Sequence, residues 1–197
     1  TGGDAINDCA GDFVVDEVDT AGDLLSLADC LLIEDLTLQN TVLTGLNGLP
    51  SLIAVSQVLT IQDTPLTSLS GFPNLQSVGG TLTIQGNDQL SSLQSLPSLG
   101  HVQVLNITDN ASLTSLDGLS SELGVEGPLN ISNNPALCQS VADAFIAAAC
   151  VGMCPGLFTT GGNTGSCPGG DDDDAGDDDD AGDDDDTGDD DDTGDDD

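Results

Sequence analysis

A repeat of 23 to 24 residues runs through the middle of the chain and limits the folds that it can adopt. The repeat units open at Leu36, Leu59, Leu82, Leu105 and Leu129. Each unit begins with Leu, then Thr or Asn, then Leu or Ile, then a polar residue, and this period of two is typical of a half-buried strand. A unit of this size cannot bury its apolar side alone, so successive units must stack on one another.

A turn is expected directly after each strand, because the fifth residue of each unit is of a type that tolerates a left-handed backbone conformation. These residues are Asn40, Asp63, Gly86, Asp109 and Asn133.

The return path of each unit carries apolar residues in steps of three, as at Leu66, Leu69, Phe72, Leu75 and Val78. This spacing favours an extended or 3₁₀ path over an α-helix, and the prolines that follow the third apolar position agree with that. The sequence therefore predicts a mainly β fold, a right-handed parallel β-solenoid with strands near residues 36–39, 59–62, 82–85, 105–108 and 129–132.

The N-terminal segment reads Cys9-Ala10-Gly11-Asp12-Phe13-Val14-Val15, followed by Asp23-Leu24-Leu25 and Cys30. Together with the repeats, it resembles the receptor L-domain type of leucine-rich solenoid, found in cell-surface receptors, fungal wall proteins and many secreted bacterial proteins. The resemblance covers roughly residues 9–150. It implies an N-terminal cap in which a cysteine pair closes the first rung. That family has ligand-binding surfaces but no shared catalytic residues, so the resemblance assigns no site residue.

The chain has six cysteines and no C-x₂-C pair typical of metal sites, which indicates disulfides formed in an oxidising compartment. Cys9 and Cys30 are about one repeat apart, so this pair can tie a cap rung to its neighbour. Segment 140–149 is compatible with a capping helix, in which Ser140 and Asp143 have capping-box spacing.

The four C-terminal cysteines can pair in more than one way. Cys138 and Cys150 would lie about 15 to 18 Å apart along that helix, too far for a disulfide. We expect Cys138 to pair with Cys154 and Cys150 with Cys167. The alternative pairs Cys138 with Cys167 and Cys150 with Cys154.

The charge is entirely one-sided, with 36 acidic residues, no Lys, no Arg and a net charge of −36. Such a chain has nothing with which to neutralise nucleic-acid phosphates, and an anionic membrane surface would repel it. No apolar stretch is long enough to span a bilayer. We expect an extracellular or cell-surface protein, secreted with its signal peptide already removed. It divides into a cap (1–35), rungs (36–137), a second cap (138–170) and a tail (171–197).

The tail repeats Asp-Asp-Asp-Asp-Ala/Thr-Gly with a period of six. Its carboxylates repel one another within the Debye length, which keeps the segment extended. Calcium prefers clustered oxygen ligands with glycine at the turns, so several low-affinity Ca²⁺ ions are expected here. The alternative is a solvating acidic tail. The candidate ligands are Asp171, Asp172, Asp173, Asp174, Asp177, Asp178, Asp179, Asp180, Asp183, Asp184, Asp185, Asp186, Asp189, Asp190, Asp191, Asp192, Asp195, Asp196 and Asp197.

The outward positions of the strands should form two polar columns on a flat face. That face is a candidate for binding a glycan, a protein, ice or a neighbouring subunit, or it is simply a well-formed sheet surface. The columns are Thr37, Thr60, Thr83, Asn106 and Asn130, and Gln39, Gln62, Gln85, Thr108 and Ser132.

Three glycosylation sequons occur, at Asn106, Asn110 and Asn130. Two of them share one outward column on adjacent rungs, where two glycans would crowd each other. Because the repeat requires polar residues there, chance sequons are the default interpretation.

Catalysis is not expected. The single histidine, His101, is expected on a solvated loop, and no cationic side chain is present to stabilise an oxyanion or a phosphoryl group.

Three functions fit the sequence. The first is a subunit of a surface layer or filament, cross-linked through calcium bound by the tail, because acidic copies can associate only through cations. The alternatives are a cell-surface recognition or adhesion module and an Asp-rich protein that nucleates mineral.

Overall fold

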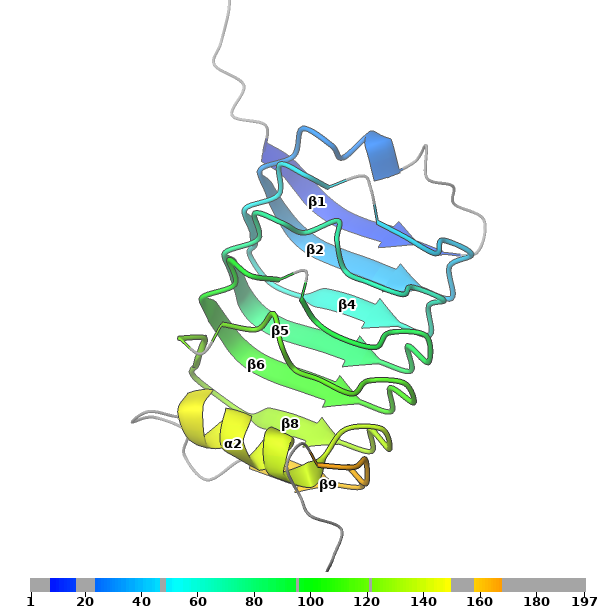
Figure 1. The fold of residues 1–197 in the computed structure, drawn as a ribbon. Helices are drawn as coiled ribbons and strands as arrows, with labels where there is room; N and C mark the ends of the chain where they lie inside the picture. Colours follow the sequence, from blue (N-terminus) through cyan, green and yellow to red (C-terminus); the bar gives the residue numbers. More distant parts are fainter. Residues whose placement is uncertain are drawn as a thin grey trace, which may run out of the picture.

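The computed structural model describes residues 8–16, 24–46, 49–94, 96–120, 122–149 and 158–167. The strands of one sheet follow one another down the molecule, from β1 at the top of Figure 1 to β9 at the bottom. Helix α2 lies across the lower end. The elements are β1 (Asp8–Val15), β2 (Leu32–Gln39), β3 (Ala54–Val55), β4 (Leu59–Gln62), β5 (Ser77–Gln85), β6 (His101–Thr108), β7 (Gly124–Val125), β8 (Leu129–Ser132), α2 (Gln139–Ala149) and β9 (Phe158–Gly161).

The strands pair in parallel and in the register that the repeat predicted, so the β-solenoid is confirmed. Leu36, Leu59, Leu82, Leu105 and Leu129 face one another across successive rungs. Strands β2, β5 and β6 begin earlier than expected. In each rung, a short stretch of strand pairing precedes the pairing of the leucine-repeat strand. The residues that pair in it are Ile33, Val55, Val78, Val102 and Val125.

The core is a stack of aliphatic side chains between the sheet and the return path. The inward residues of the strands and the residues spaced by three on the return path are almost all fully buried. The described parts of the return path contain no α-helix, and short turns close through bonds such as Phe72 N to Leu69 O at 3.2 Å and Leu99 N to Leu96 O at 3.2 Å. The predicted extended or 3₁₀ path is therefore confirmed.

The turn after each main strand is left-handed, as its residue types indicated. The φ angles are 50° at Asn40 and Asp63, 67° at Gly86, 59° at Asp109 and 57° at Asn133. A sixth rung not anticipated from the repeat turns in the same way at Gly162, with a φ of 69°.

The N-terminal cap is tied to the first full rung. β1 pairs in parallel with β2, and a disulfide joins Cys9 to Cys30 with a Cα–Cα distance of 5.5 Å. This pairing confirms the expected cysteine pair.

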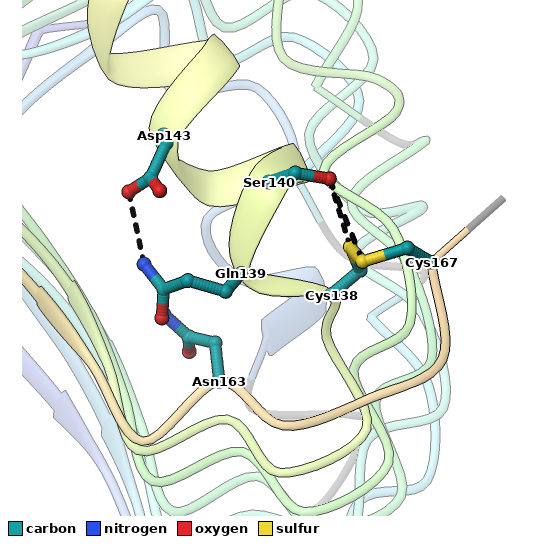
Figure 2. Close-up of a disulfide and its surroundings, with 6 residues drawn as sticks. All are labelled: Cys138, Gln139, Ser140, Asp143, Asn163 and Cys167. Carbon is teal, nitrogen blue, oxygen red and sulfur yellow. Dashed lines mark hydrogen bonds between the residues drawn. A yellow bond between two sulfur atoms is a disulfide. The ribbon is translucent and has the colours of Figure 1, made fainter. Parts of the chain in front are cut away.

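The C-terminal cap contains the expected helix and one strand that the sequence reasoning missed. Helix α2 begins one residue before Ser140, so the expected capping box is wrong. The Ser140 hydroxyl lies 3.0 Å from Cys138 Sγ, while Asp143 accepts a hydrogen bond from the Gln139 side chain (Figure 2). β9 then pairs in parallel with β8 and adds a rung outside the leucine repeat.

The second disulfide corrects the preferred pairing, because Cys138 bonds to Cys167 and not to Cys154. Strand β9 returns the chain to the start of α2, where Gly165 N donates to Leu137 O at 2.9 Å and the two cysteine Cα atoms lie 4.9 Å apart. This bond belongs to the alternative pairing. Its other half, Cys150 with Cys154, lies outside the described residues and stays a prediction.

Two carboxylates face each other where the N-terminal cap meets β2. Asp12 pairs in register with Asp35. Desolvation, followed by the nearby Asp35 and Glu34 carboxylates, raises the pKa of Asp12 above its ordinary value of 3.8. Because the folded state binds this proton more tightly than the unfolded chain, ionisation of Asp12 destabilises the cap, and that effect grows as the pH rises through the folded-state pKa.

We expect Asp12→Asn to stabilise the chain at pH 7 and to make no difference below about pH 3.8, where the wild-type carboxyl is protonated in both states. Urea unfolding midpoints measured from pH 3 to pH 7 check this. Glu122→Gln, which removes one charge from a distant rung, is the control. An equal effect of Asp12→Asn at both ends of the pH range would show that Asp12 carries no such linkage.

Candidate ligand-binding face

The outward side of the sheet carries the two polar columns in register. The first column comprises Thr37, Thr60, Thr83, Asn106, Asn130 and Thr159, and the second comprises Gln39, Gln62, Gln85, Thr108, Ser132 and Gly161. All except Thr159 are half-buried, as expected for side chains that stand next to their neighbours on adjacent rungs. We refer to this surface as the outer face.

The second column becomes smaller toward the C-terminal end of the solenoid. Gln85 pairs with Thr108, Thr108 with Ser132, and Ser132 with Gly161, so each step removes side-chain atoms. A shallow hollow of about 460 Å³ lies over this part of the face. It is lined by Thr83, Gln85, Asn106, Thr108, Asp109, Asn130, Ser132 and Asn133.

Hydrogen bonds hold several of these side chains in place. Gln85 Nε2 donates to Asp109 Oδ2 at 3.2 Å, and Ser132 Oγ donates to Asn130 Oδ1 at 2.8 Å. Further along the face, Gln62 Nε2 donates to Asp63 Oδ2 at 2.9 Å. The outer face is therefore an ordered array of amides and hydroxyls with carboxylates at the turn side.

A column of buried asparagines stands directly behind the turn that borders the outer face. This asparagine ladder consists of Asn87, Asn110, Asn134 and Asn163, each at most 3 % exposed. The side-chain oxygen of Asn110 accepts bonds from Asn87 N and Nδ2, at 3.0 and 3.3 Å. Its own Nδ2 donates to Ile84 O and to Asn134 Oδ1, both at 3.0 Å.

The ladder runs from the turn after β4 to the C-terminal cap. Thr64 donates its backbone N–H and its hydroxyl to Asn87 Oδ1, at 3.1 and 2.6 Å. Asn163, held by the C-terminal cap, accepts from Asn134 N at 3.1 Å and donates to Ile131 O at 2.8 Å. Among the described residues, no fully buried side-chain nitrogen or oxygen lacks a partner.

The sequence reasoning missed this ladder, although the sequence carries a signal for it. Each ladder residue follows directly after a left-handed turn residue, as Asn87 follows Gly86 and Asn110 follows Asp109. Polar residues at one fixed place in a buried repeat must pair with one another, because an unpaired polar group is costly in a core.

The three sequon asparagines have different environments. Asn110 is fully buried and donates both amide hydrogens, so the folded chain has no room for a glycan there. Asn106 and Asn130 pair in register on the outer face and both line the hollow. Glycosylation at these two positions stays a prediction.

The other predicted site residues lie elsewhere. All nineteen aspartates of the tail lie outside the described residues. Within the described part of the chain, no three His, Cys, Asp or Glu side chains gather in a metal-binding arrangement, and no helix is long and apolar enough to span a membrane. His101 is the first residue of β6 and not a loop residue, because it pairs with Ser77 and Gly124 on neighbouring rungs.

Comparison with known proteins gives one family. The model of the Receptor L domain family matches residues 28–145, which is narrower than the segment 9–150 expected from the resemblance and omits β1 and β9. No curated protein and no solved structure is similar enough to the chain to count as a match.

Replacing Asn110 with alanine is expected to lower the free energy of unfolding by at least about 2 kcal/mol, because Asn87 N, Ile84 O and Thr108 O lose a buried partner. Urea denaturation measures the change. Asn106→Ala, on the outer face of the same rung, should cost less than about 0.5 kcal/mol. Equal costs for the two variants would contradict a stabilising role for the ladder.

Proposed function

Because the chain belongs to the Receptor L domain family, we propose that it is an extracellular recognition module that binds its ligand on the outer face of the sheet. The observation that carries the proposal is the hollow over β5, β6 and β8, lined by side chains that are held in register. The family is a non-enzymatic, ligand-binding one.

The outer face is better suited to recognition than the other surfaces of the described solenoid. Each outward side chain has a neighbour at the same position one rung away, so a ligand meets donors and acceptors at a regular spacing. The rungs behind it are fully packed, which keeps the array rigid and lowers the entropy that binding would cost.

An extracellular or cell-surface location is consistent with the family and with both disulfides of the described residues. We infer that the chain performs no catalysis. Its one histidine is held in a strand between two rungs, and no Lys or Arg exists to stabilise a developing negative charge.

Binding to an array of neutral, sulfated and carboxylated oligosaccharides and of extracellular peptides tests the proposal. Thr83→Arg places a bulky cation in the middle of the outer face and should weaken binding of the recognised ligand by about tenfold or more. Thr67→Arg, on the exposed return path, is the matched control and should bind like the wild type. Binding that is equally strong in both variants would place the ligand on another surface.

A second function is favoured by the composition of the tail. We propose that Ca²⁺ ions bind along residues 171–197 and link copies of the chain into a surface layer or filament. Nineteen aspartates in one segment repel one another, and the chain contains no Lys or Arg to offset them. Divalent cations at millimolar extracellular concentration would relieve that repulsion and could be shared between tails.

Calorimetry and sedimentation velocity, with calcium and after chelation, test this second function. The full chain should bind several ions and associate, and a chain ending at Gly170 should do neither. A full-length variant with every tail aspartate changed to asparagine keeps the length and removes the charge, so it should behave like the shortened chain. Equal binding and association by the full and shortened chains would rule out the tail as the linker.

A further inference from the structure

The hollow on the outer face exists because one column loses bulk from rung to rung. Gln39, Gln62 and Gln85 occupy the first rungs of that column, and Thr108, Ser132 and Gly161 occupy the later ones. The main-chain register stays the same, so the missing side-chain atoms leave space above a continuous sheet. Its volume of about 460 Å³ lies in the range of small-ligand sites.

The lining presents groups that both donate and accept hydrogen bonds. Asn106, Asn130 and Gln85 contribute amides, and Thr108 and Ser132 contribute hydroxyls. A sugar hydroxyl also donates and accepts, so a chain of hydroxyls can match such a surface at several points. A peptide ligand would need an apolar anchor, and none of the large apolar side chains exposed in the described residues lines the hollow.

The charge of the hollow excludes anionic ligands. Asp109 lies at its edge, and the chain has no Lys or Arg that could balance a sulfate, phosphate or carboxylate. The Asp109 carboxylate accepts one bond from Gln85 and keeps further acceptor capacity. A ligand hydroxyl could donate to it in a charge-assisted bond, which is stronger than a bond between neutral groups.

Hydrogen bonds to the next rung hold the turns that border the hollow. Asp109 and Asn133 are the left-handed turn residues that directly precede the ladder residues Asn110 and Asn134. Asn133 N donates to Gly161 O at 2.7 Å and Asn110 N donates to Asn134 Oδ1 at 3.0 Å, so both turns are held by the next rung. The polar groups are thus placed before any ligand arrives, which reduces the entropy lost on binding.

From this geometry we propose that the hollow over β5, β6 and β8 binds a short, uncharged oligosaccharide. The inference rests on the proposed function, since it specifies the ligand class and the position of the site on the outer face. No aromatic side chain lines the hollow, so binding depends on hydrogen bonds without ring stacking. Individual contacts are therefore weak, and affinity comes from their number.

An NMR titration of the full chain tests the ligand class. The probes are tetrasaccharides of glucose, mannose and galactose, and a glucuronic acid tetrasaccharide as the charged counterpart. At least one neutral probe should shift the side-chain amide signals of Asn106, Asn130 and Gln85, and the anionic probe should leave them unchanged. Anionic binding as strong as neutral binding, or no shift with any neutral probe, would overturn the proposal.

Filling the hollow tests its position. Thr108→Gln combined with Ser132→Gln continues the glutamine column of the first rungs, so the fold should accept both changes. Affinity for the neutral probe should fall by about tenfold or more. Thr67→Gln, the same substitution on the exposed return path, is the control and should bind like the wild type.

The outcomes separate this inference from the proposed function. If Thr60→Arg, on the outer face but outside the lining of the hollow, weakens binding while the filled variant binds like the wild type, the outer face is the binding surface and the hollow is not the site. If neither variant weakens binding of the neutral probe, both proposals fail. Unchanged urea midpoints in each variant exclude a loss of binding through unfolding.

Discussion

Burial of apolar side chains between successive rungs is the constraint on which the rest of the structure depends. Each rung contributes two inward strand residues, such as Leu82 and Ile84, which are fully buried only because a rung lies on either side. Each such side chain contributes about 1.5 to 3 kcal/mol relative to exposure. Since the first and last rungs lack one neighbour, both ends need covalent or helical closure, and a disulfide ties the chain at each end.

Stacking also buries the residue that follows each left-handed turn residue, so water cannot satisfy its polar groups. The asparagine ladder meets that requirement, because each amide bonds both to the backbone of its neighbours and to the next ladder side chain. The last member, Asn163, is supplied by the disulfide-tied cap. The C-terminal cap therefore closes the asparagine ladder as well as the stack of apolar side chains. It also holds the turns that border the hollow.

A chain without Lys or Arg must satisfy its carboxylates with neutral donors. Asp35 accepts from Val58 N at 2.7 Å, Asp63 from Gln62 and Asp109 from Gln85. Where two carboxylates meet, as at Asp12 and Asp35, desolvation and then the neighbouring carboxylate raise the pKa of Asp12. The absence of Lys and Arg is the reason that we propose cations and uncharged molecules as partners. The outer face presents mostly neutral groups.

The sequence by itself determined the period, the inward leucines, the left-handed turns and the outward columns, because a repeat imposes the same local choice on every rung. It also indicated that Cys9 pairs with Cys30, which lie one rung apart. Local patterns could not identify β9, because its residues Phe158-Thr159-Thr160-Gly161 lack the leucine repeat. The segment is recognised as a strand only by its pairing with β8. For the same reason they could not show that Cys138 reaches Cys167. Tertiary structure decided how the ladder asparagines pair, that Asn110 is fully buried and where the hollow lies, because each depends on side chains 23 or more residues apart that meet only when the rungs stack.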